Sequence, residues 1–292
     1  KLYGRLLMKK YNHWQIAYRE DMNKDFKLVQ NPAWAWAADP FLVEYEDRIY
    51  LFAELFLYKS ERNGVIGCCK YEDGKFGEWF VTMDCHWHLS YPNVWTEEGN
   101  LYMCPETYQT GEVAVYKLEA FPDRWRKIRV LLQNGKYVDS TFMKYGNKNY
   151  LFTYRLTNSS IAGNLLLYEI FPDGTLSKER FISDDIGSAR PGGKVIVNEE
   201  KKVVRVSQDS ANGYGAGLVF SEVESVNPVY REKKLLRVGP DEIIGNWNRS
   251  FTGVHTYNRF KNMEVIDLNY LTFSFSESIA QKRVRKVFTN KY

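Results

Sequence analysis

A strand pattern that recurs five times, at intervals of roughly fifty to sixty-five residues, constrains the fold of this chain more than any other feature. In each copy a polar residue at a turn precedes a short apolar strand, and a hairpin leads to a second strand. The copies begin at Asp39, Tyr91, Asp139, Arg190 and His255. Repeats of this length with four strand-like runs are typical of β-propellers. We therefore predict an all-β, five-bladed β-propeller.

The repeat divides residues 1–292 into blades of one domain, without a linker. The last blade has one strand fewer than the others, and we expect residues 13–21 to supply its outermost strand. An N-terminal strand in that place closes the ring and leaves no sheet edge unpaired. We also expect strands at 192–198 and 270–278. The predicted blades span residues 22–87, 88–135, 136–186, 187–240 and 241–280.

The charge balance argues against a nucleic-acid partner, because 40 basic and 36 acidic residues give a net charge of only +4. The one dense basic run, KRVRK at 282–286, fits a solvated terminal segment, with an anionic membrane surface or an acidic substrate as the alternative. No stretch approaches the roughly eighteen apolar residues of a membrane span, and the first residues lack the apolar core of a signal peptide. We expect no transmembrane segment and a cytoplasmic location, with the membrane surface as an alternative.

The cysteines and histidines do not form a metal-binding motif. The four cysteines include one adjacent pair and no CxxC pair, so a zinc site is not predicted. Cys85, His86 and His88 lie along a strand-like segment, where structural roles are the simpler interpretation. We predict reduced cysteines and no cofactor.

The five polar residues that open the copies indicate a functional site. The innermost strand of each propeller blade lines the central channel, so the residues just before these strands converge on one mouth. A purely structural repeat would keep a similar residue in each copy, whereas Asp39, Tyr91, Asp139, Arg190 and His255 all differ. We interpret the five as a site, with a water-filled polar channel as the alternative.

A second set of carboxylates is expected near the same mouth. Glu54 follows Asp39 by fifteen residues, Glu106 has the same spacing in blade two, and Asp209 ends the corresponding run in blade four. So many carboxylates require Arg190, Arg155 or a cation among them, and crowding raises some of their pKa values. A raised pKa is what a general acid requires.

Several carboxylates in one cleft suit transfer at the anomeric carbon of a sugar. One acts as base or nucleophile, a protonated one donates to the leaving oxygen, and a third tunes the pair. Aromatic residues near the mouth could stack on sugar rings, although packing between blades explains them equally well. The candidate catalytic residues are Asp39, Asp139, Glu106 and Glu54. The candidate substrate-binding residues are Tyr91, Asn93, Arg190, Asp209, His255, Trp36 and Trp95.

The segment WAADPFLVEYEDRIYLFAE resembles the first blade of the five-bladed glycosidase superfold that includes arabinanases, xylosidases, invertases and levansucrases. This resemblance implies that Asp39 is the base or nucleophile, that Glu106 or Glu54 is the acid, and that Asp139 tunes the acid. It also implies that His255 helps to hold a water or a central cation such as calcium.

A second resemblance covers almost the whole chain. The motifs ADPF, HLSYPNVW, PET, DST, RPGG, SQD and GVHTYN occur in this order. Together they are similar to the N-terminal domain of the plant glucosamine inositolphosphorylceramide transferase family and its bacterial relatives. In the plant proteins a separate glycosyltransferase domain follows, and the bacterial relatives accompany enzymes of surface-polysaccharide synthesis. The resemblance implies a carbohydrate or glycolipid substrate and a fused or partner glycan-synthesis domain.

Two classes of function remain open on the sequence. The first is a carbohydrate-active enzyme that acts at a glycosidic linkage, either a glycosyltransferase of surface-polysaccharide or glycolipid synthesis or a glycoside hydrolase. The second is a glycan-binding propeller without catalytic activity. An enzyme requires an acid and a base close to a common point, whereas a binding module requires only hydrogen bonds and a stacking face.

Overall fold

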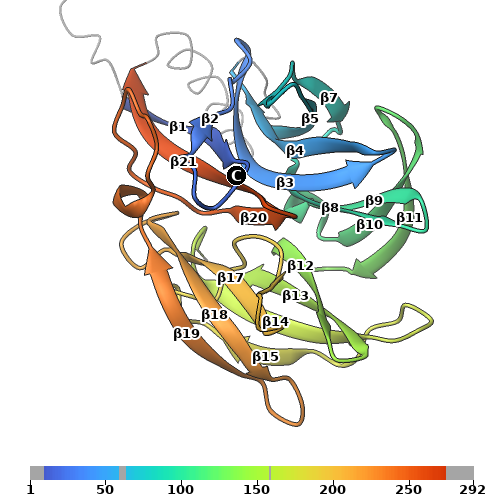
Figure 1. Ribbon diagram of the computed structural model, residues 1–292. Helices are drawn as coiled ribbons and strands as arrows, with labels where there is room; N and C mark the ends of the chain where they lie inside the picture. The colour runs from blue at the N-terminus through green and yellow to red at the C-terminus, as the bar shows by residue number, and fades with distance from the viewer. Residues whose placement is uncertain (1–9, 59–63, 158, 274–292) are drawn as a thin grey trace, which may run out of the picture.

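The computed structural model describes residues 10–58, 64–157 and 159–273, and these form five antiparallel sheets around a common centre (Figure 1). The predicted five-bladed propeller is confirmed. Within the described residues, helical structure is limited to two 3-10 turns, η1 (Tyr108–Thr110) and η2 (Pro240–Glu242). None of these residues forms a helix of the length and apolarity that a membrane span needs.

Each of the first three blades begins with its innermost strand and continues outward by hairpins. Blade one contains β3 (Ala35–Tyr45), β4 (Arg48–Leu57), β5 (Gly64–Glu72), β6 (Lys75–Phe76) and β7 (Phe80–Met83). Blade two contains β8 (Ser90–Glu97), β9 (Asn100–Glu106), β10 (Val113–Ala120) and β11 (Arg124–Leu132). Blade three contains β12 (Tyr137–Tyr145), β13 (Lys148–Leu156), β14 (Gly163–Ile170) and β15 (Arg180–Ser183).

The last two blades have shorter inner strands. Blade four contains β16 (Ile196–Val197), β17 (Val203–Asp209), β18 (Gly217–Ser225) and β19 (Arg231–Val238). Blade five contains β20 (Tyr257–Phe260), β21 (Met263–Phe273), β1 (Lys10–Arg19) and β2 (Lys27–Leu28). The strand expected at 192–198 is therefore reduced to two residues. Gly193 has φ +139°, a left-handed backbone that interrupts a strand at this point.

The N-terminal strand closes the ring, as predicted, but in a different place. β1 pairs with β21 over its whole length, and β2 forms the outer edge, in the order β2-β1-β21-β20. The expectation that residues 13–21 are outermost was wrong, because β21 continues without a turn from Met263 to Phe273 and takes in the start of the strand expected at 270–278. Residues 274–278 and the basic run at 282–286 lie outside the described residues.

The inner strands of blades one to three share a bulge that places the repeated polar residue. Their pairing registers shift between Ala38 and Phe41, Ser90 and Asn93, and Val138 and Thr141. Inside each shift lies a residue with positive φ, and these are Asp39 (+52°), Tyr91 (+42°) and Asp139 (+50°). A bulge re-aims a side chain, and a left-handed backbone at a non-glycine residue costs about 1–3 kcal/mol. The fold thus maintains strained backbone at three equivalent positions around the channel.

Apolar side chains between neighbouring blades form the core. Phe41 and Phe52 of blade one pack with Val94 and Met103 of blade two, and all four are fully buried. Burying a side chain of this size stabilises the fold by roughly 1.5–3 kcal/mol. These layers fix the blades relative to one another and so fix the distances across the channel.

Replacing Gly193 with alanine is expected to lower the free energy of unfolding by about 3 kcal/mol or more. A Cβ at this position would overlap the carbonyl oxygen of Tyr257, and φ of +139° is unfavourable for alanine. Gly213 is the matched control, because its φ is +118° and a Cβ there meets nothing within 4 Å. Its replacement is expected to cost only about 1–2 kcal/mol in urea denaturation. Equal losses for the two variants would contradict this account.

Candidate functional site at the channel mouth

Asp39 lies at the centre of the described site. Its carboxylate accepts hydrogen bonds from the backbone N–H of Tyr91 (3.1 Å) and the hydroxyl of Thr256 (2.7 Å), and one oxygen lies 3.5 Å from Nε2 of His255. The residue is 5% exposed. Burial raises the pKa of Asp39 to about 6, and the charge of His255 opposes the rise. Asp39 is therefore a carboxylate that titrates near neutral pH.

Tyr91 connects three blades through its side chain. Its hydroxyl lies 2.8 Å from the hydroxyl of Thr141 and accepts a hydrogen bond of 2.8 Å from the backbone N–H of Gly193. The ring packs edge-on against Phe41 and is fully buried. Tyr91 therefore holds blades one, three and four at the channel, and its hydroxyl is engaged in those bonds.

Asp139 and Arg190 form a buried ion pair. Nε of Arg190 donates to Oδ2 of Asp139, and the same oxygen accepts a hydrogen bond of 2.8 Å from the side-chain amide of Gln208. The guanidinium also lies against the ring of Tyr214, with its carbon 5.3 Å from the ring centroid. Burial lowers the pKa of Arg190, but the carboxylates of Asp139 and Glu106 more than offset it, so the arginine stays charged.

Glu106 lies in the wall of a cavity of about 710 Å³ beside this ion pair. Its Oε2 is buried without a hydrogen-bond partner and lies 3.9 Å from Nη2 of Arg190. Burial raises the pKa of Glu106 well above its ordinary value, the charge of Asp139 raises it further, and Arg190 opposes both. Burial and the charge of Asp139 thus favour the protonated form of the Glu106 carboxyl group. The cavity is also lined by Tyr108, Lys136, Ser159, Ser160, Ile161 and Tyr214.

Glu54 lies deeper in the same group of charges. Burial raises its pKa well above the ordinary value, and Asp39 and Glu106 add to the rise. One oxygen of Glu54 lies 3.5 Å from Nε2 of His88, a histidine whose pKa is lowered by burial to about 4. Burial therefore favours the uncharged form of both Glu54 and His88. Glu54 is not among the residues that line the cavity.

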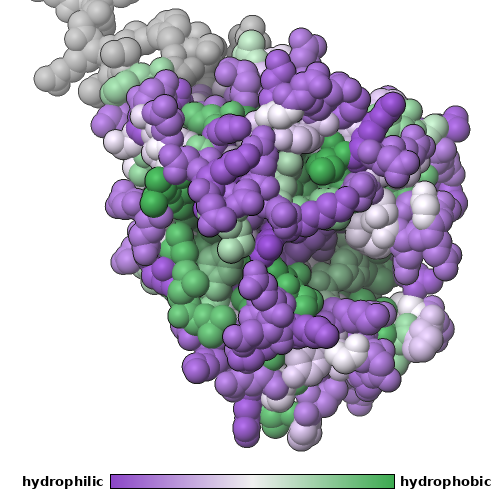
Figure 2. All heavy atoms as spheres, viewed as in Figure 1, coloured by the Kyte–Doolittle hydropathy of each residue, from purple (hydrophilic) through white to green (hydrophobic). Residues whose placement is uncertain are grey.

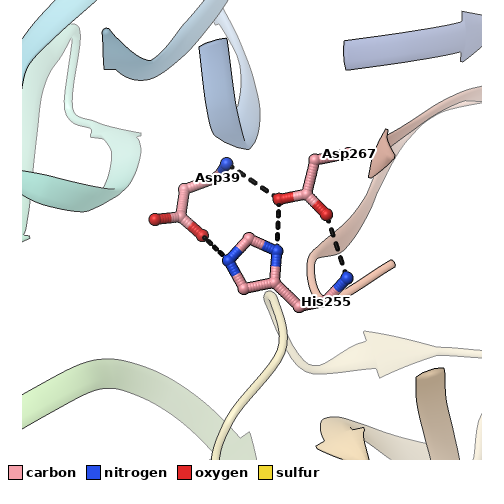
Figure 3. Close-up of side chains that lie close together, drawn as sticks. All are labelled: Asp39, His255 and Asp267. Carbon is pink, nitrogen blue, oxygen red and sulfur yellow. Dashed lines mark hydrogen bonds and ion pairs between the residues drawn. The ribbon is translucent and has the colours of Figure 1, made fainter. Parts of the chain in front are cut away.

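His255 lies between two aspartates (Figure 3). Its Nδ1 is 2.7 Å from Oδ2 of Asp267, and its Nε2 faces Asp39. Burial lowers the pKa of His255, but Asp267 and Asp39 more than offset burial and raise it above the ordinary value. The ring stacks on Trp14 with centroids 4.1 Å apart and contacts Tyr214 edge-on. The imidazole ring is thus held between two carboxylates, which favour its charged form.

The same three residues offer one atom each within 4.8 Å of one another, as ligands of a cation would. Calcium prefers six to eight oxygen ligands. Here the two ring nitrogens of His255 face different carboxylates, and the Asp267 carboxylate already accepts backbone N–H bonds from Asp39, His255 and Thr256. This donor set fits a group of ion pairs supported by backbone hydrogen bonds and does not fit a calcium ion.

The other substrate-binding candidates have structural contacts. Asp209 accepts hydrogen bonds from Nε of Arg237 (2.5 Å) and from the backbone of Ala211 (2.9 Å) in the turn after β17. Asn93 donates to the carbonyl of Ser140 in the next blade. Neither residue lines the cavity.

The two tryptophans among the candidates also pack inside the protein. Trp36 stacks on Phe56 at 4.5 Å, with the rings nearly parallel. Trp95 packs between Tyr102 and Phe142, at the boundary of blades two and three. Of all the residues predicted from the sequence, Glu106 and Arg190 line the cavity.

Five residues that the sequence interpretation omitted complete the site. The sequence marks one of them, because Asp267 interrupts an apolar run in the second strand of blade five, as Glu54 does in the second strand of blade one. The remaining four come from loops and neighbouring blades, where no repeat position marks them. The five residues are Trp14, Gln208, Tyr214, Thr256 and Asp267.

A second cavity, of about 340 Å³, has a different character. It lies between blades four and five and is lined mainly by apolar side chains of β18, β19 and β21 and of the loop after β19, with the Arg19 and Glu264 ion pair in its wall. The exposed side chains of Leu236 and Ile244 adjoin it. Figure 2 shows a mostly hydrophilic surface with hydrophobic areas between the blades. Of these two cavities in the described part of the chain, the first is the one lined by charged groups of the site, Glu106 and Arg190.

A family model and curated proteins match the greater part of the chain. The model described as "Glucosamine inositolphosphorylceramide transferase 1, N-terminal" matches residues 27–257. Glucosamine inositolphosphorylceramide transferase 1 of Oryza sativa subsp. indica is 30% identical over 216 residues, which are 71% of this chain and 29% of that protein. The Arabidopsis thaliana protein of the same name is 33% identical over 208 residues, 67% of this chain and 26% of its own length. The chain thus spans less than a third of these relatives.

Solved structures of similar fold include glycoside hydrolases. The catalytic domain of a GH62 α-L-arabinofuranosidase from Coprinopsis cinerea has a TM-score of 0.57 at 10% identity, covering 83% of this chain and 93% of its own. An endo-1,4-β-xylanase from Bacteroides thetaiotaomicron has a TM-score of 0.58 at 12% identity, covering 82% and 91%. At these identities the likeness concerns the propeller fold.

Proposed function

This chain belongs to the family of N-terminal domains of glucosamine inositolphosphorylceramide transferase 1, and from that premise we propose that it is a carbohydrate-active enzyme that transfers a glycosyl group in glycolipid or surface-polysaccharide synthesis. The proposed site is the cavity of about 710 Å³ at the channel mouth. Because the family match covers about a third or less of the relatives, we further propose that the domain acts beside a fused or partner glycan-synthesis domain. We also propose that the protein acts in the cytoplasm, at the membrane surface.

The observation that supports this proposal most directly is the burial of the Glu106 carboxyl group beside the cavity, which raises its pKa. Its Oε2 is buried and has no hydrogen-bond partner among the described residues, and Glu106 is one of the residues that line the cavity. A buried polar atom without a hydrogen-bond partner destabilises the fold, so its presence at this position indicates a functional role. A carboxyl group that is protonated at neutral pH can donate its proton to a leaving oxygen.

The reaction that we propose uses two carboxylates of the site. The hydroxyl of an acceptor attacks the anomeric carbon of the donor sugar, and its proton passes to Asp39. The bond from that carbon to the leaving oxygen breaks, and the oxygen takes the proton of Glu106. Asp139, in contact with Arg190, sets the charge beside Glu106 and keeps that carboxyl group protonated. With water in place of the acceptor, the same steps describe hydrolysis.

Glycan binding without catalysis is the second candidate, and the contacts of Asp39 favour it. Both of its oxygens accept hydrogen bonds from other blades, and Asp39 does not line the cavity. The cavity itself has the hydroxyl, amine and aromatic groups that bind sugars. A binding module would retain sugar affinity when Asp39 is changed.

The proposal is tested by screening the purified chain against aryl glycosides and activated sugar donors, with Asp39→Asn as the paired variant. We expect turnover that falls below about pH 6, where Asp39 takes up a proton, and that Asp39→Asn abolishes. If no donor turns over and saturable glycan binding survives Asp39→Asn, the protein is a binding module and the enzymatic proposal is wrong.

A further inference from the structure

Asp267 is a buried charge in the middle of an apolar strand. It lies in β21 between Ile266 and Leu268, and its exposed fraction is 0%. A carboxylate in such a position destabilises the fold unless hydrogen bonds and an opposite charge compensate it. The hydrogen bonds and charges that stabilise the buried carboxylate therefore indicate which residues Asp267 holds in place.

Its partners come from both sides of the site. Oδ1 accepts hydrogen bonds from the backbone N–H groups of His255 (3.0 Å) and Thr256 (2.9 Å). Oδ2 accepts one from the backbone N–H of Asp39 (3.0 Å) and lies 2.7 Å from Nδ1 of His255. One carboxylate thus holds the backbone of Asp39 and of His255 by hydrogen bonds and lies in ion-pair contact with the imidazole (Figure 3).

The charges that act on His255 from neighbouring strands are negative and come from three carboxylates. Asp267 of β21, Asp39 of β3 and Asp139 of β12 are the carboxylates whose charge acts on it. Trp14 of β1 and Tyr214 of the loop after β17 cover the ring without contributing a positive charge. An imidazolium is favoured here over a neutral imidazole, because each of its two ring nitrogens faces a carboxylate, Nδ1 that of Asp267 and Nε2 that of Asp39.

We propose that Asp267 is a positioning residue that keeps His255 doubly protonated, and that this imidazolium in turn keeps Asp39 ionised at the channel mouth. Without the charge on His255, burial would protonate Asp39 at neutral pH and remove it as a base. The use of Asp39 as a base rests on the proposed function. The charge state of His255 does not, so the two can be tested separately.

The first test is nitrogen NMR of the wild-type chain, labelled in its four histidines, at pH 7. We expect both ring nitrogens of His255, assigned with a His255→Gln variant, to show imidazolium shifts. His88 is the internal control, because its pKa of about 4 predicts a neutral ring in the same spectrum. A neutral His255 in the folded wild-type chain would overturn the proposal, and this measurement needs no variant at position 267.

The second test is Asp267→Asn, which keeps the size of the side chain and removes its charge. We expect His255 to become neutral at pH 7, and the acidic limb of activity to move to higher pH by about one unit. A spectrum in which His255 stays doubly protonated in the folded variant would show that Asp267 does not hold its charge. If the wild-type chain turns over no substrate, the proposed function fails, and the spectra still decide the role of Asp267.

Discussion

Replacing Glu106 with glutamine is expected to reduce glycosyl transfer about 10²–10⁴-fold, because the amide cannot donate a proton to the leaving oxygen. The loss should depend on the leaving group. Aryl glycosides of acidic phenols need little protonation, so their turnover should fall much less than that of alkyl glycosides. The two substrate series are compared as kcat/KM at pH 7, wild type against variant.

Glu112→Gln is the matched control for Glu106→Gln. Glu112 precedes β10 in the same blade, is partly exposed and pairs with Lys127, so this change alters a carboxylate outside the cavity. We expect it to leave both series unchanged. A uniform loss for good and poor leaving groups in Glu106→Gln would contradict the role of proton donor and would favour a role of Glu106 in binding.

Replacing Arg190 with methionine is expected to lower the free energy of unfolding by about 3–5 kcal/mol. The change removes the charge that compensates Asp139, whose side chain is 3% exposed. The uncharged amide of Gln208 still donates a hydrogen bond to that carboxylate. Breaking one partner out of a buried pair costs more than the pair contributes, because the remaining charge stays in a poorly solvated place. Urea denaturation at pH 7 measures the effect.

Two further variants determine whether the lost charge causes this effect. Arg155→Met breaks a pair with Glu179 in which both side chains are more than a third exposed, and it should cost less than about 1 kcal/mol. Adding Asp139→Asn to Arg190→Met should recover part of the stability, because no unpaired charge then remains. If the double variant is as unstable as the sum of the single changes, lost packing explains the effect and the charge does not.

The sequence predicted the architecture because the repeat is a local property. Each blade is built by hairpins between neighbouring strands, so strand patterns and turns within some fifty residues were enough to recognise it. Ring closure was predicted for the same reason, since blade five was one strand short. The order of strands in that blade was not predicted, because β21 and β1 pair across more than 240 residues of sequence, as the contact of Arg19 with Glu264 illustrates.

The sequence also identified the positions that face the channel. Asp39, Tyr91 and Asp139 occupy equivalent bulges with positive φ, and this equivalence explains why the same place in each repeat carries a polar residue. Their specific contacts could not be predicted. Tyr91 and Asn93 connect blades, and Asp209 pairs with Arg237, although all three looked like substrate-binding residues.

The sequence by itself determined five blades, a polar channel mouth and an excess of carboxylates there. Only the tertiary structure decided which of these carboxylates are close to a positive charge and which have a raised pKa. Asp39 meets Thr256 and Asp267 across 217 and 228 residues, and Glu106 meets Arg190 across two blades. A pKa depends on burial and on charges within a few ångströms. Here both come from residues that are distant in the sequence, so the local sequence does not reveal them. Packing between blades sets both, so the distinction between Glu106 in the cavity and Asp39 behind it appears only in the folded ring.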